Sequence, residues 1–250
     1  DARDRLSGEQ GRRDAVEFCR RRGIRRVYFP VRLHERGKTP WTVPAEIHAF
    51  CRDAFEAAGV EFHGLVRPFN FGARPSTGWP ETPCPTDPQA MTDIEEAFAL
   101  AASRFDSILI DNRLFFDCAC GECARAKGGV SWAAWRRERL TETLERRALA
   151  AARAANPRAR LILKFPSWHE SIATRGYDPR LHSTLFPQTC AGAETRDPQA
   201  IERWGGRQPY GGYFTAAYLR AAAPERCPGA WIDTLACDEV IFCAQAWGAA

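Results

Sequence analysis

The sequence predicts an α/β fold of the (β/α)8 TIM barrel type, formed as one domain by residues 1–250. Short β-branched or aromatic runs alternate with longer amphipathic stretches, which is the pattern of βα units around a parallel sheet. A length of 250 residues is typical of a single barrel. The number of units and the long segments after several strands favour a barrel over a flavodoxin-like open sheet.

The strand pattern recurs seven times along the chain. We expect strands at 26–31, 61–67, 107–112, 161–165, 190–194, 230–235 and 240–244. Because a helix precedes the first of these strands, an eight-stranded barrel needs its opening strand upstream of Asp1. The sequence therefore predicts a barrel lacking its first strand, as a piece of a longer protein.

Helix start and stop signals separate these strands. Expected starts are Ser7 with Gln10 as a capping box, Pro44 in a first turn, and Asp87 and Asp197, each followed by proline. The longest helix is expected at 132–155. It ends at Asn156-Pro157 because proline disfavours the helical conformation of the residue before it.

Composition excludes several classes of function. Hydrophobic residues make up 45% of the chain, and no apolar run approaches the roughly 20 residues of a membrane span. The net charge of +4 comes from arginines spread over helical stretches. No basic run is interleaved with aromatics, so we expect no nucleic-acid partner. The absence of a phosphate-binding glycine motif after a strand argues against an organic cofactor.

The compartment and the oligomeric state stay open. Residue 1 begins a polar stretch without the pattern of a signal peptide, so the protein could be cytoplasmic or secreted. Ten cysteines do not decide the matter, because some are clustered and others are isolated. Cys19, Cys51 and Cys243 are interpreted as isolated buried thiols.

A cluster of cysteines predicts a metal site. Cys118, Cys120 and Cys123 follow the strand expected at 107–112, and Cys84 lies in the loop after the preceding strand. Loops that follow adjacent barrel strands are neighbours, so four thiolates could hold a tetrahedral zinc ion. Such a site is closed and therefore structural. The alternative is a pair of disulfides or free thiols.

The segment around this cluster resembles the zinc-carrying branch of bacterial β-galactosidases. The similarity runs from Asp111-Asn112-Arg113 through the cysteines to the arginine-rich helix at 135–140. In those enzymes the acid/base glutamate directly follows the asparagine, but this chain has Arg113 there. The resemblance therefore does not carry their catalytic assignment to this position.

A second resemblance spans roughly the whole chain. The sequence is similar to a bacterial family of glycoside hydrolase barrels with a Cys…Cys-x-Cys-x-x-Cys cluster. The matching segments are Asp111 before Phe115-Phe116, the cysteines, and residues 164–168, 192–197 and 231–233. This resemblance implies the fold more than the reaction.

Three carboxylates are candidates for catalysis. Asp111, Glu194 and Asp233 each lie at the end of a different expected strand, where the loops of a barrel converge. Glycosidic cleavage needs two carboxyl groups, one to protonate the leaving oxygen and one to attack the sugar or activate water. By analogy with retaining α-galactosidase-like barrels, Asp111 is the nucleophile and Glu194 the acid/base. Asp233 is the substitute.

The alternative for each carboxylate is a salt bridge at the barrel mouth with Lys164, Arg196 or Arg113. Nearby residues are expected to bind the substrate: two cations could pair with an acid or a sugar hydroxyl, and aromatic rings could stack on sugar faces. These candidates are Asn112, Lys164, Trp168, His169, Arg196, Trp79 and Phe116.

These residues predict hydrolysis of a glycosidic bond in an oligo- or polysaccharide, without a catalytic metal. Two alternatives stay open. Arg113, in place of a catalytic glutamate, fits a non-catalytic carbohydrate-binding barrel. An open metal site at the cysteines or at His169 fits a metal-assisted hydrolase.

Overall fold

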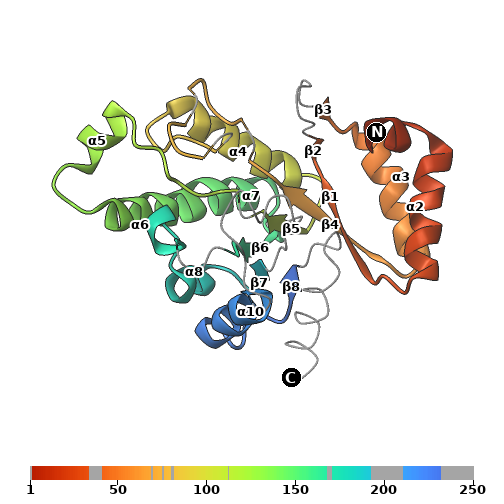
Figure 1. The fold of residues 1–250 in the computed structure, drawn as a ribbon. Helices are drawn as coiled ribbons and strands as arrows, with labels where there is room; N and C mark the ends of the chain where they lie inside the picture. The colour runs from red at the N-terminus through yellow and green to blue at the C-terminus, as the bar shows by residue number, and fades with distance from the viewer. Residues whose placement is uncertain are drawn as a thin grey trace.

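A six-stranded parallel sheet forms the centre of the computed structural model (Figure 1). The structure describes residues 2–33, 41–68, 70–74, 76–79, 82–111, 113–167, 171–192 and 211–231. The strand order is β1-β4-β5-β6-β7-β8, which follows the order of these strands in the chain. Their bounds are β1 Arg26–Pro30, β4 Glu61–Val66, β5 Ser107–Ile110, β6 Arg160–Phe165, β7 Gln188–Gly192 and β8 Ala230–Trp231.

The two edges of this sheet approach each other. Tyr28 lies on β1 and Trp231 on β8, at opposite ends of the strand order, yet their ring centroids are 5.9 Å apart. A flat sheet would hold these strands five inter-strand spacings apart, or about 24 Å. The sheet is therefore curled, and the predicted α/β barrel class is confirmed.

Helices surround the curled sheet (Figure 1). Figure 1 shows α1 to α3 beside β1 and β4, with α8 and α10 beside β7 and β8. The helical segments are α1 Ala2–Ser7, α2 Glu9–Arg21, α3 Ala45–Ala57, α4 Pro88–Ala102, α5 Gly121–Lys127, α6 Trp132–Glu142, η1 Thr143–Leu149, α7 Ala150–Ala155, η2 Ala173–Arg175, α8 Pro179–Leu185 and α10 Gly211–Ala222. Alternation of strands and helices follows the expected βα order.

Six of the seven expected strands occur in the structure. β6 and β7 begin one and two residues earlier than expected, and the other four end before the expected position within the described residues. The strand expected at 240–244 and residues 232–235 of the preceding one lie outside the described residues. The helix expected at 132–155 is also present, as α6, η1 and α7 in succession, with a π-helical middle. Its C-cap is Asn156, as predicted.

The helix starts were predicted with mixed success. Asp87 caps α4, because its side chain accepts a hydrogen bond from the Gln89 amide. Pro44 is the N-cap of α3 rather than a residue of its first turn. The capping box was wrong: Ser7 is the last residue of α1, and Gly8 caps α2 without a side-chain bond. Asp197 lies outside the described residues.

A small antiparallel sheet, which the sequence did not predict, follows β1. It pairs β2 (Arg32–Leu33) with β3 (Trp41–Thr42), joining Arg32 to Thr42 and Leu33 to Trp41. The Val43 amide then donates to the Val31 carbonyl at 3.0 Å. These bonds hold the segment before α3 against the carboxyl end of β1.

Candidate active site and metal centre

Three charged residues form a row at the carboxyl ends of adjacent strands. Val66 of β4 pairs with Ile110 of β5, and Ile110 pairs with Leu163 of β6. One residue further along each strand are Arg67, Asp111 and Lys164. Successive strand side chains point to opposite faces, so the register aligns these three on one face.

Asp111 is held by both neighbours in this row. Its Oδ2 accepts a hydrogen bond from Arg67 Nε at 2.5 Å, and its Oδ1 accepts one from Lys164 Nζ at 3.3 Å. Asp111 is only 3% exposed. Burial favours the neutral carboxyl, but the charges of Lys164 and Arg67 outweigh it and hold the pKa of Asp111 below its usual value. The carboxylate is therefore ionised.

Lys164 connects Asp111 to the aromatic interior of the barrel. Its Nζ lies 4.6 Å from the centroid of the Trp231 ring, which is a favourable cation–π distance. Trp231 in turn contacts Tyr28, and Tyr28 packs edge-on against His63 at 5.5 Å. One buried ammonium thus interacts with both a carboxylate and an aromatic ring.

Of the predicted substrate-binding aromatic residues, Trp79 and Phe116 lie within the described part of the chain. Trp79 is partly buried, and its ring lies 5.8 Å from the Arg113 guanidinium and 5.4 Å from that of Arg175. Phe116 differs from the expectation, because its side chain is 0% exposed and packs in the core. The other substrate candidates, Asn112, Trp168, His169 and Arg196, lie outside the described residues, as do the catalytic candidates Glu194 and Asp233.

The four cysteines of the predicted cluster come together. The Sγ atoms of Cys84, Cys118, Cys120 and Cys123 all lie within 4.8 Å of one another, and all four are free thiols. Cys84 Sγ is 3.6 Å from Cys123 Sγ and 4.0 Å from Cys120 Sγ. Zinc–sulfur bonds of about 2.3 Å in a tetrahedron place the sulfurs about 3.8 Å apart, while a disulfide needs about 2.05 Å. The donor set fits zinc.

Threonines and tryptophans surround these thiols. Thr86 Oγ1 lies 3.3 Å from both Cys84 Sγ and Cys123 Sγ, and Trp135 packs against the cluster. Burial raises the pKa of Cys118, but hydrogen bonds from Thr77 and the Cys120 backbone outweigh it and lower that pKa to about 6. Burial instead raises the pKa of Cys84 and Cys123, so in the metal-free cluster only Cys118 and Cys120 are shifted toward the thiolate.

Asp117 ties the cysteine loop to the preceding loop. Its Oδ2 accepts from the Trp79 amide at 2.7 Å, and its Oδ1 accepts from the Thr82 hydroxyl at 3.3 Å. Gly78 permits this approach, since a Cβ at that position would lie 2.3 Å from Asp117 Oδ1. The loops after β4 and β5 are therefore joined both at the thiols and at Asp117.

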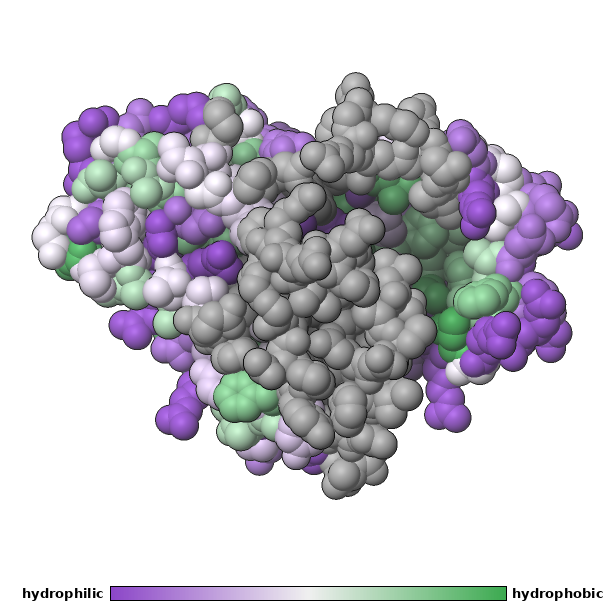
Figure 2. All heavy atoms as spheres, viewed as in Figure 1, coloured by the Kyte–Doolittle hydropathy of each residue, from purple (hydrophilic) through white to green (hydrophobic). Residues whose placement is uncertain are grey.

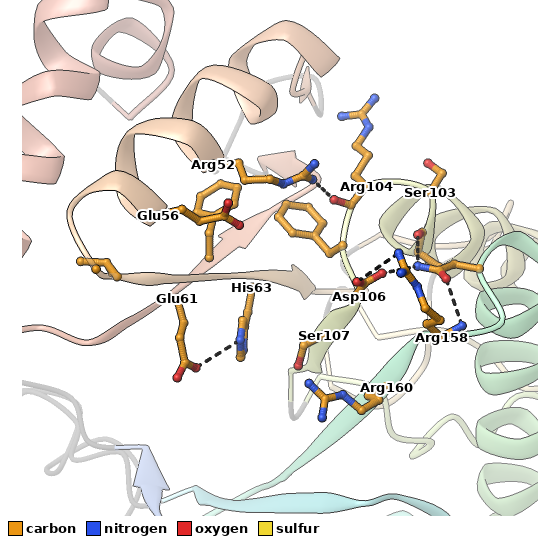
Figure 3. A pocket seen from close by; sticks show the side chains of 16 residues that line it. Arg52, Glu56, Glu61, His63, Ser103, Arg104, Asp106, Ser107, Arg158 and Arg160 are labelled. Atoms are coloured by element: carbon orange, nitrogen blue, oxygen red, sulfur yellow. Dashed lines mark hydrogen bonds and ion pairs between the residues drawn. The ribbon is translucent and has the colours of Figure 1, made fainter.

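A cavity of about 640 Å³ opens at the other end of the strands (Figure 3). Figure 3 shows the first residues of β4, β5 and β6 facing it, together with charged side chains of α3 and of the loops before β5 and β6. Its labelled residues include Glu61, His63, Ser107 and Arg160. Because the first residues of the strands line it, this cavity lies at the opposite end of the barrel from Asp111. Barrel enzymes work at the carboxyl ends of their strands.

Sequence reasoning missed Arg67. An arginine at the last position of the strand expected at 61–67 was the available signal, but its partner depends on the register between β4 and β5. Tyr28 and Trp231 were likewise treated as strand residues only, since their contact depends on the curl of the sheet.

The fold and the site define a (β/α) barrel with an ionised carboxylate at a strand end and a closed four-thiol centre beside it. The chain belongs to the family described as "probable glycosyl hydrolase, catalytic domain", whose model matches residues 2–250. No curated protein matches the chain.

Solved structures with a similar fold include several glycoside hydrolases. A β-galactosidase from Rahnella sp. R3 aligns with 88% of this chain at a TM-score of 0.55 and 14% identity, and a Bacteroides uniformis β-glucuronidase with 89% at 0.53 and 10%. The chain spans only 40% and 22% of their lengths. The catalytic domain of Paenibacillus polymyxa β-amylase aligns with 88% of this chain and over 87% of its own length, at a TM-score of 0.52 and 10% identity. At these identities the similarity concerns the fold alone.

Among the described residues, no helix combines the length and the apolar character needed to cross a membrane.

Proposed function

We propose that this chain hydrolyses a glycosidic bond in an oligo- or polysaccharide with paired carboxylates. The observation that carries the proposal is Asp111, a buried and ionised carboxylate at the carboxyl end of β5 in a member of a glycosyl hydrolase family. An ionised acid is suited to attack an anomeric carbon or to stabilise positive charge there. It is not suited to donate a proton.

Asp111 is the nucleophile in this proposal. Its carboxylate bonds to the anomeric carbon as the glycosidic C–O bond breaks, and the leaving oxygen takes the proton of Glu194. Glu194 then removes a proton from water, whose oxygen displaces Asp111 and releases the sugar. Asp233 is the substitute for either role, and the cations of Lys164 and Arg67 keep Asp111 ionised between turnovers.

Substrate recognition is assigned to residues of the same loops. Trp168 and Trp79 offer aromatic faces to sugar rings, while Asn112, His169 and Arg196 offer hydrogen bonds. Lys164, which was also a candidate for substrate binding, is assigned to Asp111 instead, because its ammonium lies 3.3 Å from that carboxylate.

Cys84, Cys118, Cys120 and Cys123 hold a structural zinc ion in this proposal, and no organic cofactor is required. With four protein ligands the ion would have no open position for water, so it would fasten the loops after β4 and β5. The support is the sulfur spacing and the burial of three of the four thiols.

The test is activity of single-residue variants on chromogenic glycosides and on a panel of polysaccharides. Asp111→Asn and Glu194→Gln should each lower kcat/KM by at least about a hundredfold while the circular dichroism spectrum stays unchanged. Asp233→Asn tests the substitute. Full activity in both of the first two variants excludes them from the mechanism.

A non-catalytic carbohydrate-binding barrel is the second candidate. The observation that favours it is that both Asp111 oxygens are already engaged by cations. Glycan binding by wild-type protein, with no product from any substrate of the panel, would support this alternative.

A further inference from the structure

The inward face of the barrel carries a polar row at each end of the strands. Along β4, β5 and β6 this face repeats one order: a polar residue, an apolar residue and a charged residue. The members are His63, Leu65 and Arg67, then Ser107, Leu109 and Asp111, then Arg160, Ile162 and Lys164. Ser107 lies four residues before Asp111, so about 13 Å and an apolar layer separate the two rows.

The first residues of these triplets, His63, Ser107 and Arg160, form what we call the amino-end row. Ser107 pairs with Arg160, and the pairing of Gly64 with Ile108 places His63 beside Ser107. Neighbouring strands are about 4.8 Å apart, so the three side chains lie within reach of one small ligand. All three line the cavity of about 640 Å³, as Figure 3 shows. That volume is within the range of small-molecule pockets.

The guanidinium of Arg160 differs from the other guanidinium groups of this cavity. Arg52 and Arg104 donate to backbone carbonyls, and Arg158 pairs with Asp106 at 3.5 Å. In the part of the chain that the structure describes, the Arg160 guanidinium has neither a hydrogen bond nor an ion pair. Figure 2 shows hydrophilic residues over the helices on both sides of the view, so exposed charge alone does not mark a site.

The charges around the amino-end row favour an anion. Glu61 is already matched by Arg26, whose Nε lies 2.5 Å from its carboxylate. The pKa of His63 is lowered, first by burial and then by the charges of Arg26 and Arg160, while Glu61 opposes this change. Two cations therefore act on this position against one acid, and the local potential is positive.

We propose that Ser107 and Arg160, with His63 as one wall, form a binding site for a small oxyanion, either inorganic phosphate or sulfate or the phosphomonoester group of a small molecule. A guanidinium binds two oxygens of a phosphate through parallel N–H groups, and a serine hydroxyl can donate to a third. The bound anion would join β5 to β6 and stabilise the folded chain. The proposal does not rest on hydrolysis, because the site lies at the opposite end of the strands from Asp111.

The shape and charge of the cavity favour a small ligand over a polyanion such as nucleic acid. A polyanion needs cations along an extended groove. Glu56 and Asp106 line the same cavity as Arg160, and they would repel a chain of phosphates that ran past the amino-end row. One anionic group at Arg160 avoids both carboxylates, since Asp106 is held by Arg158 and by Asn156 at 2.7 Å.

Isothermal titration calorimetry at constant ionic strength tests the proposal with inorganic phosphate, sulfate and glucose 6-phosphate. Saturable binding of at least one probe at one site per chain is expected. Arg160→Gln should weaken it at least about tenfold, and Arg160→Lys, which keeps the charge but loses the fork, should weaken it less. Arg158→Gln is the matched control, because Arg158 lines the same cavity, is paired with Asp106 and should not matter. Tighter binding of glucose 6-phosphate than of phosphate would identify a monoester, and equal binding the inorganic anion.

The position of the bound anion is tested by NMR of the histidine rings. The probe should shift the signals of His63, assigned with His63→Gln, but not those of His48 and His182, which are 1% and 0% exposed. Asp111→Asn should bind the probe as wild type does. Three results would overturn the proposal: no saturable binding of any probe, equal affinity in wild type and Arg160→Gln, or tighter binding in Asp111→Asn without a shift of His63, which would place the anion beside Lys164. Failure of the hydrolysis assays leaves all of these measurements unchanged.

Discussion

Lys164 Nζ lies 3.3 Å from Asp111 Oδ1, and both side chains are about 95% buried. Two ions are costly to remove from water, and their attraction offsets this cost only while both are present. The pair is therefore coupled, because removing either group takes a buried opposite charge away from the other. Arg67, whose side chain is 43% exposed, supplies a second cation from the solvent side.

The coupling predicts a large effect of Lys164→Met on stability. We expect the free energy of unfolding to fall by about 3 kcal/mol, because the buried carboxylate loses the Lys164 ammonium. The measurement is urea unfolding at pH 7. Adding Asp111→Asn should recover part of the loss, with an interaction energy of about 1 to 3 kcal/mol in the double-mutant cycle.

An exposed ion pair provides the control for that cycle. Arg20 and Glu17 pair on α2 with side chains 62% and 46% exposed, so Arg20→Met should change the unfolding free energy by less than about 1 kcal/mol. If Lys164→Met is equally mild, the buried pair is not coupled as the distances indicate.

Arg67→Met should change the pH dependence of activity. Removing the guanidinium takes away a charge and a hydrogen bond that lower the pKa of Asp111, so that pKa rises. If Asp111 acts as an ionised nucleophile, the acid limb of the kcat/KM profile should move up by about one pH unit. Arg26→Met, which breaks a pair with Glu61 at the other end of the barrel, should leave the limb in place.

The cysteine cluster predicts one zinc ion per chain. Metal analysis of purified protein should give a zinc-to-protein ratio near one, and Cys118→Ser or Cys123→Ser should abolish it and lower Tm. Cys190→Ser is the control, because Cys190 lies on β7 outside the cluster and should retain the metal. A mass four units below the reduced value, with no metal, would instead indicate two disulfides.

The sequence was sufficient to predict the six described strands of the parallel sheet and the cysteine cluster. Ile108, Leu109 and Ile110 form a short apolar run that is buried on both faces of β5, as in other parallel sheets. Cys84 lies 34 positions before Cys118, but their loops follow adjacent strands. Barrel topology alone therefore brings them together.

The burial of Phe116 could not be predicted from the sequence. An aromatic residue in a loop after a strand has the same sequence signal whether it faces solvent or the core. In the structure the loop after β6 covers this segment: the Phe116 amide donates to the Arg175 carbonyl at 3.3 Å, and the Tyr177 hydroxyl donates to the Leu114 carbonyl at 2.8 Å. Contacts between loops of different strands depend on the closed fold.

His182 predicts a loss of stability in mild acid. The residue is 0% exposed on α8, and burial lowers its pKa from 6.5 to about 4. Its Nε2 lies 2.9 Å from Thr141 Oγ1, and its Nδ1 accepts a hydrogen bond from the Asp178 amide, so the folded state favours a neutral ring. The unfolded chain binds a proton near pH 6.5 and the folded chain only near pH 4.

The contribution of His182 is therefore complete above about pH 6.5 and declines as the pH falls toward 4. Linkage gives a loss of roughly 3 kcal/mol over this range. Urea unfolding at pH 7, 5.5 and 4.5 measures it, and His182→Gln, which cannot be protonated, should lessen the slope. His63, partly exposed in the barrel, provides the comparison: its pKa is lowered less, so His63→Gln should change the slope less. Equal slopes for wild type and His182→Gln would show that the ring is protonated in the folded protein.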